Sequence, residues 1–441
     1  MNNQRRRWGY AHPRGAAVAL AALTALGLAA CGSGSSGAAS STAGGKVQIT
    51  LSMQNPNVQQ QDPATYAIVQ AFQKANPDIT VKIEGQTVDE HEKAMQVAAQ
   101  SGTLPDIFWV YNSLASQMAQ QGKLLDLGPV LQEGNLTDKF PKAMLSGYTS
   151  NGTQYGVPYQ SLVTGLYVNT SILQKYGLSE PKTFDELLNV AQVLSKNGVT
   201  TIAQGASKSA YSVWAFLTML DRFGYEDKYQ DVLSGKASYN NADFLRLYQH
   251  IEQLAKAGAF SKSVSTQTYV QAVEEFTSGN AAMLDSGVWA AGDIQKSSVA
   301  ASTKFWAGPT FSDGVGDQNL YMNAPSAPLV VSAEVKKSAA KLDAVKKFMA
   351  FYYGDSGQQI LVDNAQTPVT TYKPQVDAST QPVFASVLSV LQQDGWHSPA
   401  AQPDLVVSAE TSSAMYDSIY GVIQGVYSPS QALDVVQKTI H

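Results

Sequence analysis

The segment after residue 46 alternates between the pattern of a strand and the pattern of a helix. Apolar and polar residues alternate in the strand segments, whereas apolar residues recur every three or four positions in the helical ones. Asp62 and Pro63 give the first helix a capping residue and then a proline at its first position. The segments are a strand at Val47–Met53, a helix from Pro63 to Ala75, a strand at Ile79–Ile83, a helix at about Val88–Ser101 and a strand ending at Val110. This order predicts an α/β fold with a parallel sheet and right-handed crossovers.

Polar residues directly follow two of these predicted strands. Gln54 and Asn55 come after the first strand, and Tyr111 and Asn112 come after the third. In parallel sheets flanked by helices, ligands bind beyond the carboxyl ends of the strands. We therefore expect these four side chains to contact a ligand; for Tyr111 and Asn112, the alternative is a pair that caps a loop.

Two stretches rich in glycine and proline interrupt the regular pattern, at residues 152–160 and 308–328. We interpret both as crossings between two domains. Tyr159 and Gln160 end the first stretch. They are predicted either to contact a ligand held between the domains or to hold the hinge.

The region between the two crossings is mainly helical. Apolar spacing of three and four predicts helices at 184–197, 212–223, 242–257 and 269–278. Tyr211 and Trp214 stand at the start of the second of these helices, where they could overhang a binding site, although core packing competes strongly for Trp214. A strand at 281–284 is followed by a predicted turn over Asp285–Trp289.

The first 45 residues have the pattern of an exported, lipid-anchored protein. Four arginines precede a largely apolar stretch, Ala16–Ala30, which is too short to span a bilayer stably. The stretch ends in Leu-Ala-Ala before Cys31, which is the pattern of a bacterial lipobox. Residues 1–30 are thus predicted to be a signal peptide and Cys31 the lipidated residue. Residues 31–45, with their small side chains, are predicted to be a flexible tether with a mean reach on the order of 20 Å.

The length and net charge of the chain limit its domain organisation and its possible partners. A chain of 441 residues exceeds what one core normally supports, so two domains are expected. Loss of residues 1–30 removes four arginines and no acidic residue, which takes the net charge from −5 to −9. An acidic exported body argues against nucleic acid as a partner, because binding it needs clustered Lys and Arg.

Several short segments together resemble the maltose-type extracellular solute-binding proteins of ABC importers, family 1. The resemblance covers about 390 residues, and each segment alone is a weak signal. The segments are Ala71–Asp78, Ser101–Asp106, Gly122–Asp126, Tyr155–Tyr159, Leu166–Asn169, Pro181–Glu186, Phe276–Met283, Gly287–Trp289 and Ala344–Phe351.

This resemblance implies a two-lobed periplasmic-binding-protein-like fold of type II, with each lobe a mainly parallel sheet flanked by helices. Lobe 1 would comprise residues 46–160 plus 328–375, and lobe 2 residues 161–327 plus 376–441. The family often places a sugar-stacking aromatic at the position of Trp289. The resemblance further implies a sugar or oligosaccharide ligand, ABC-importer permease subunits as partners, a monomeric protein and a location on the extracytoplasmic face of the cell membrane.

Other classes of protein remain open at this level. A glycoside hydrolase would need two carboxylates facing each other across a cleft, for which Glu84, Asp106, Asp285 and Asp293 are available. Asp106, which follows Pro105, is interpreted as part of a structural turn, and neither chemical conversion of the ligand nor a cofactor is expected. A metal site is not expected either, since the four histidines beyond the signal peptide are scattered and no second cysteine exists. A surface sensor or adhesin using the same binding fold is the remaining alternative.

Overall fold

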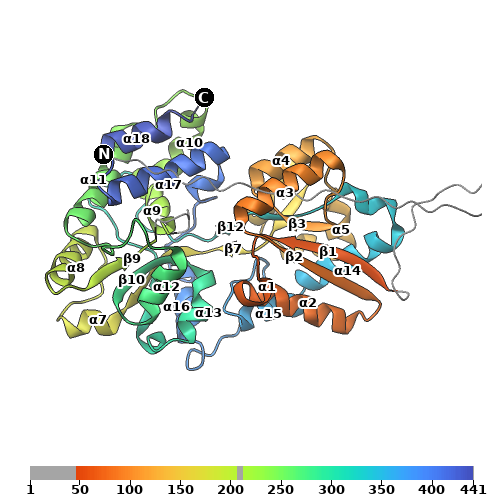
Figure 1. Ribbon diagram of the computed structural model, residues 1–441, viewed down its shortest axis with the longest axis horizontal. Coiled ribbons are helices and arrows are strands. Elements are labelled where there is room, and N and C mark those ends of the chain that lie inside the picture. Colours follow the sequence, from red (N-terminus) through yellow and green to blue (C-terminus); the bar gives the residue numbers. More distant parts are fainter. Residues whose placement is uncertain (1–45, 206–211, 441) are drawn as a thin grey trace, which may run out of the picture. The chain divides into compact units, whose positions relative to one another are not determined.

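The computed structural model of the protein describes residues 46–205 and 212–440. The predicted signal peptide, Cys31, the tether and Tyr211 lie outside these described residues. The described residues form two larger sheets, each flanked by its own helices, as predicted (Figure 1), and two further sheets of two short strands each. In the described ranges, none of the helices has the length and apolar character needed to cross a membrane.

The first sheet has five strands in the order β2-β1-β3-β13-β6. Their bounds are β1 Val47–Met53, β2 Ile79–Gly85, β3 Ile107–Trp109, β6 Gly156–Pro158 and β13 Pro328–Val331. β1 pairs with β2 and β3 in parallel, which confirms the parallel pairing predicted from the sequence. β13 is antiparallel to both β3 and β6 and brings a distant part of the chain into the sheet.

Helices cover both faces of the first sheet. On one face lie α2 (Pro63–Ala75) and α14 (Ala339–Tyr352), and Trp109 is buried against them. On the other face lie α3 (Val88–Ser101) and α4 (Asn112–Gln120), and the neighbouring Phe108 is buried against these. Successive strand residues point to opposite faces, so adjacent aromatic residues can enter two separate cores.

The second sheet has four strands in the order β11-β8-β10-β9, and it corrects the expectation of a mainly parallel sheet in each lobe. The strands are β8 Thr164–Asn169, β9 Thr200–Ala203, β10 Ala281–Gly287 and β11 Thr303–Trp306. Only β9 and β10 are parallel, while β8 is antiparallel to both β10 and β11. The physical reason is that β8 starts at the crossing and runs away from it, whereas β10 runs back towards it.

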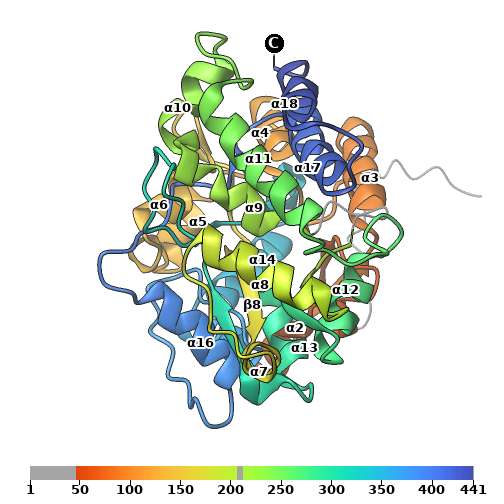
Figure 2. The same ribbon diagram turned by 90° about the vertical axis from the view of Figure 1, so that its left-hand side faces the viewer.

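Two helical layers enclose this second sheet. Leu166 is buried among the helices of one layer and its neighbour Tyr167 among those of the other. Figure 2 views this part with α8 and α11 in front. The first layer contains α8 (Phe184–Lys196), α9 (Trp214–Met219), α11 (Ala242–Lys256) and α17 (Ala409–Ile423), and the second contains α12 (Tyr269–Thr277), α13 (Ala291–Gln295) and α16 (Pro382–Leu391).

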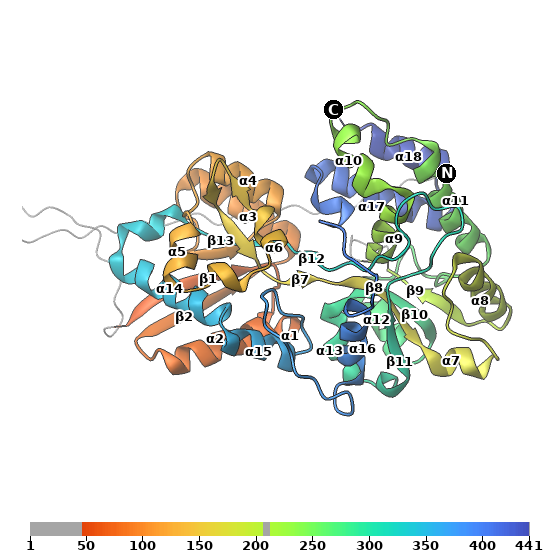
Figure 3. The ribbon, with the colours of Figure 1, turned by 180° about the vertical axis from the view of Figure 1, so that it is seen from behind.

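A pair of short strands links the two sheets. β7 (Ser161–Leu162) follows β6 and pairs antiparallel with β12 (Ala324–Pro325), which precedes β13 (Figure 3). A further passage, residues 364–381, leads without helix or strand from α15 (Asp355–Asp363), which packs against α2, to α16, which packs against β11. The chain therefore passes between the sheets through three segments of the described part.

The structure changes the bounds of two predicted elements. The helix predicted at 212–223 divides into α9 and a short 3-10 helix, Asp221–Phe223. Most of the predicted crossing at 308–328 instead packs against the helices that surround the second sheet. Arg222 holds it there by donating hydrogen bonds to the carbonyl oxygens of Ala307 (3.2 Å) and Leu320 (2.8 Å). A buried arginine thus anchors a loop that the sequence pattern predicted to be a crossing between the two domains.

Candidate functional site

The crossing leaves the first sheet at the edge where β1 and β3 end. The backbone N–H of Val110, which follows β3, lies 3.4 Å from the carbonyl oxygen of Pro328 at the start of β13. Pro328 in turn pairs with Pro158 at the end of β6. The residues after β1 and β3 therefore share an edge of the sheet with the two crossing strands, which we call the first crossing edge.

The second sheet meets the crossing in the same way. β8 begins two residues after β7, and its first residue, Thr164, pairs with Gly287 at the end of β10. The parallel pairing of Leu284 with Ala203 places the end of β9 at this same edge, the second crossing edge. Carboxyl ends of strands from both sheets thus adjoin one pair of linking strands.

Three aromatic rings gather at the second crossing edge. The ring centroids of Trp214 and Trp289 are 4.6 Å apart at an angle of 73°, and those of Trp214 and Tyr269 are 5.8 Å apart at 90°. The Trp289 indole N–H donates to the Tyr269 hydroxyl at 2.8 Å, and this hydroxyl lies 2.8 Å from that of Ser286. These contacts fix the rings of Trp214, Tyr269 and Trp289, here called the aromatic cluster, before any ligand binds.

Within the aromatic cluster, Trp214 is buried, whereas Trp289 and Tyr269 keep part of their surface exposed. Gly287 makes room for Trp289, because a Cβ atom at this position would lie 2.1 Å from Cζ3 of the indole. Sequence analysis predicted Trp214 and Trp289 but missed Tyr269. Its available signal was its position directly after the capping residue Thr268 at the start of a helix.

Asp285 connects the second sheet to the helix that carries Trp214. Its carboxylate accepts a hydrogen bond from the backbone N–H of Ala215, in the first turn of α9, and another from the Gln204 amide, both at 3.0 Å. Burial raises the pKa of Asp285 well above that of an ordinary aspartate. The turn predicted at 285–289 is wrong in its first part, since Asp285 lies in β10 as a fully buried residue. Asp285 therefore orients α9 rather than lying in a loop.

Polar groups line the first crossing edge. The Gln54 side-chain oxygen is buried without a hydrogen-bond partner among the described residues. The backbone of Asn55 lies close to Gly85 at the end of β2, so close that a Cβ on Gly85 would lie 2.1 Å from the Asn55 carbonyl oxygen. The Tyr111 ring packs against Trp109, with centroids 4.8 Å apart. A buried amide oxygen without a partner favours a polar ligand at this edge.

Glu92, on α3, reaches this same edge and was not singled out by sequence analysis. Its carboxylate accepts the backbone N–H of Tyr111 at 2.7 Å. Burial raises the pKa of Glu92 to about 7, and the hydrogen bond from Tyr111 only partly offsets that effect. A charged residue in a mainly polar helix gives no sequence signal of this position, because only the fold brings α3 to the end of β3.

The structure gives Asn112 and Tyr159 internal contacts. The Asn112 amide donates to the carbonyl oxygen of Gly147 at 3.1 Å and accepts from the Tyr155 hydroxyl at 2.9 Å. Tyr159 is 2% exposed, and its hydroxyl donates to Asp62 at the start of α2. Burial leaves Tyr159 with a structural role in the first lobe, whereas Asn112 is only half-buried and a ligand contact by it stays a prediction.

Gln160 has a structural role through its backbone. Its N–H donates to the Ser326 hydroxyl at 2.9 Å, and its carbonyl oxygen accepts the Ser326 N–H at 3.0 Å. These bonds tie the first crossing strand to the second. The Gln160 side chain is half-buried, and a ligand contact by it stays a prediction.

Three of the four carboxylates considered for hydrolysis, Glu84, Asp106 and Asp285, have structural partners. Asp106 pairs with Lys341 at 2.9 Å and accepts the Thr50 backbone N–H at 2.9 Å, and Glu84 pairs with Lys82 at 2.7 Å. No group of three or more His, Cys, Asp and Glu side chains within residues 46–205 and 212–440 is placed to hold a metal ion.

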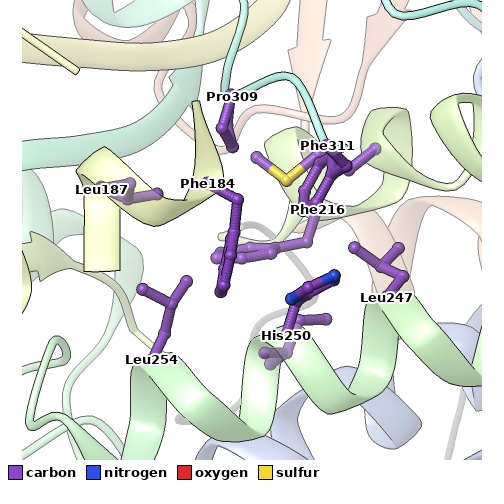
Figure 4. A pocket seen from close by; sticks show the side chains of 10 residues that line it. Phe184, Leu187, Phe216, Leu247, His250, Leu254, Pro309 and Phe311 are labelled. Atoms are coloured by element: carbon purple, nitrogen blue, oxygen red, sulfur yellow. The ribbon is translucent and has the colours of Figure 1, made fainter. Parts of the chain in front are cut away.

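A gap enclosed by apolar side chains lies elsewhere, inside the second lobe (Figure 4). Phe184, Phe216, Phe311 and His250 surround it, and it leaves no space for a water molecule. His250 faces these rings while its Nε2 lies 3.0 Å from Asp313. This gap is part of the hydrophobic core and does not suit a ligand rich in hydroxyl groups.

Comparison with known proteins places the chain among binding proteins. Residues 55–359 match the family model described as bacterial extracellular solute-binding protein. The chain is similar to the maltodextrin-binding protein MdxE of Bacillus subtilis, with 25% identity over 65% of this chain and 66% of the relative. It is also similar to the sn-glycerol-3-phosphate-binding periplasmic protein UgpB of Rhizobium meliloti, with 27% identity over 54% of each chain.

A solved structure described as a chitin oligosaccharide binding protein has the same fold, with a TM-score of 0.79 and 23% identity over 90% of this chain and 98% of that one. In sequence, the first three curated relatives are matched over 63%, 58% and 66% of their own lengths, just under two-thirds at most. The matched family model, by contrast, extends over more than half of this chain and includes both crossing strands. The chain therefore belongs to the bacterial extracellular solute-binding proteins.

Proposed function

We propose that this protein is the extracytoplasmic substrate-binding lipoprotein of an ABC importer. It binds a sugar or oligosaccharide between its two lobes, without converting it, and delivers it to the permease subunits in the membrane. The single observation that carries the proposal is the meeting of two complementary edges at the crossing strands. One edge presents the aromatic cluster, and the other presents amide and carboxylate oxygens.

Sugar chemistry matches this pair of edges. A sugar ring has apolar C–H faces and a rim of hydroxyl groups, so that aromatic rings can cover the faces while amides and carboxylates satisfy the hydroxyls. Trp289 would stack on a sugar face with Trp214 behind it. Gln54, Asn55, Tyr111 and Gln160 would line the opposite side.

The lobes in this proposal are residues 46–160 plus 328–375 and residues 161–327 plus 376–441. The paired strands β7 and β12, together with residues 364–381, would serve as the hinge. A ligand that contacts both edges has more contacts when the lobes are closed, and it therefore shifts the population towards the closed form. That closed form would be the state which the permease recognises.

A ligand screen by thermal unfolding tests the proposal. We expect at least one saccharide from a panel of mono-, di- and oligosaccharides to stabilise the protein, by about 2.7 kcal/mol when its concentration is 100 times Kd. Mass spectrometry should recover the same saccharide unchanged. A panel in which no sugar stabilises the protein, while peptides or metal ions do, would overturn the proposal.

The proposed membrane attachment depends on Cys31. A diacylglyceryl thioether and a further acyl chain at this residue would hold the protein at the membrane surface. We expect Cys31→Ala to move the full-length protein from the membrane fraction to the soluble exported fraction, as measured by fractionation and immunoblotting. Retention of the variant in the membrane fraction would contradict a lipid anchor at this position.

A further inference from the structure

Glu92 occupies an unusual position for a carboxylate. It lies in the second turn of α3, and its carboxylate accepts the Tyr111 N–H directly beyond β3. β1 is the neighbour of β3 in the sheet, so Gln54 and Glu92 reach the same crossing edge. The carboxylate and the unpartnered Gln54 oxygen are thus both at the edge that the proposed ligand would face.

No basic side chain of the described residues forms an ion pair with Glu92. On the same helix, Glu90 hydrogen-bonds to Thr87, and the His91 Nε2 lies 2.6 Å from the Trp109 carbonyl oxygen. Lys93, the next residue of α3, is exposed. Tyr111, which follows β3, donates its backbone N–H to Glu92; burial raises the pKa of Glu92, and this hydrogen bond partly offsets the rise.

Packing alone does not require a carboxylate in such a place. Asp106, at the other end of β3, shows the contrast, because its charge is balanced by Lys341 and it accepts two further hydrogen bonds from Thr50. Burial of a carboxylate that has no paired cation costs free energy, and a perturbed carboxylate of this kind beside a proposed binding site is a candidate functional group.

We propose that Glu92 determines the charge of the ligand: its carboxylate accepts hydrogen bonds from the hydroxyl or ammonium groups of a neutral or amino sugar, and it repels phosphorylated or carboxylated ligands. This inference rests on the proposed function. Hydrogen bonds from hydroxyls to a carboxylate are stronger than those between neutral groups, whereas an anionic group at the same place would meet a like charge in a poorly solvated site.

The opposite edge is consistent with this selectivity. The aromatic cluster consists of Trp214, Tyr269 and Trp289 and contributes no cation to balance a phosphate. Arg222, which is fully buried, directs its guanidinium to the backbone carbonyls of Ala307 and Leu320. Membership of the family does not fix the charge of the ligand, because the relatives described above include both a maltodextrin-binding protein and a glycerol-phosphate-binding protein.

Calorimetry on three forms of the mature protein tests the proposal. The forms are the wild type, Glu92→Gln and the control Glu90→Gln, which lies on the same helix and keeps an oxygen for the helix cap. The probes are the neutral sugars maltotriose and chitotriose, the amino sugar glucosamine, and the anions glycerol 3-phosphate and glucuronate. In Glu92→Gln, the amide oxygen of the new side chain can still accept the Tyr111 N–H, so the fold is preserved.

We expect the wild type to bind a neutral or amino sugar and neither anion, Glu92→Gln to bind that sugar at least 10-fold more weakly, and Glu90→Gln to match the wild type. Donation from ligand hydroxyls favours the ionised carboxylate, so binding of a neutral sugar at pH 7 should release protons, as measured in buffers of different ionisation enthalpy. This release should be absent in Glu92→Gln.

Two results would overturn the inference while leaving the proposed function in place. One is binding of glucuronate, an acidic sugar, more tightly than any neutral sugar, and the other is an unchanged affinity of Glu92→Gln for the neutral sugar. Binding of glycerol 3-phosphate more tightly than any sugar would overturn both the inference and the proposed sugar ligand. A response to peptides or metal ions alone would instead overturn the proposed function itself, and this inference with it.

Discussion

Replacement of Trp289 with alanine is expected to abolish the thermal stabilisation that a saccharide gives this protein. Trp289 presents the partly exposed ring of the aromatic cluster, held by its N–H donation to Tyr269 and by its edge contact with Trp214. Loss of a stacked aromatic anchor commonly weakens binding by more than about 2 kcal/mol. We therefore expect a Kd at least ~100-fold higher, equivalent to about 2.7 kcal/mol, measured by calorimetry with the sugar found in the screen.

Three further variants separate ring stacking from general damage. Trp289→Phe keeps an aromatic face but loses the hydrogen bond to Tyr269, so an intermediate affinity is expected. Gly287→Ala should also weaken binding, because its Cβ would displace the indole. Trp396→Ala removes a partly buried tryptophan that packs near α16 and should leave affinity unchanged. Wild-type affinity in Trp289→Ala would exclude Trp289 from the binding site.

Asp285→Ala is expected to lower the free energy of unfolding by about 3 kcal/mol. The change leaves the Ala215 N–H and the Gln204 amide without their acceptor in a buried site, and each unsatisfied group costs roughly 1–3 kcal/mol. The helix that carries Trp214 would lose its tie to β10, so ligand affinity should fall as well. Urea unfolding followed by circular dichroism measures the first effect.

Asp285→Asn is the matched control for this variant. Its side-chain oxygen can accept the Ala215 N–H, and the Gln204 amide can turn its oxygen towards the new NH2 group. The raised pKa of Asp285 means that the folded state holds a proton which the unfolded state releases above pH ~4. The free energy of unfolding of the wild type should therefore fall as pH rises from ~4 towards the raised pKa of Asp285. The Asn variant has no such proton, so its stability should lack this pH dependence. If Asp285→Asn lowered the free energy of unfolding as much as Asp285→Ala does, the hydrogen-bonding role of Asp285 would be contradicted.

The local pattern of the sequence predicted the first lobe well. The structure confirms β1 at Val47–Met53 and α2 at Pro63–Ala75, with the Asp62 carboxylate accepting the N–H of Thr65 as a helix cap. These features depend on neighbouring residues, and apolar alternation, capping and proline position act over only a few positions. The same reasoning explains why the carboxyl ends of β1 and β3 could be marked before the fold was known.

Prediction was weaker wherever a residue's role depends on a distant partner. Nothing near Tyr159 in the sequence indicates that its hydroxyl donates a hydrogen bond to Asp62, which is 97 positions away. For Asn112 the sequence left open a ligand contact or a loop-capping role, and its hydrogen bonds with Tyr155 and Gly147 depend on segments 43 and 35 positions away. Glu92 was missed because its position at the crossing edge results from the return of α3 across the sheet.

The sequence by itself determined the alternation of strands and helices, the two-lobed α/β class and the family, because periodicity and short motifs are written in consecutive residues. Tertiary structure alone decided the antiparallel course of β8, the aromatic cluster of Trp214, Tyr269 and Trp289, and the position of the Glu92 carboxylate. The physical reason is that strand direction, ring contacts and desolvation depend on which distant segments meet, and the crossing strands fix those meetings only when the chain has folded.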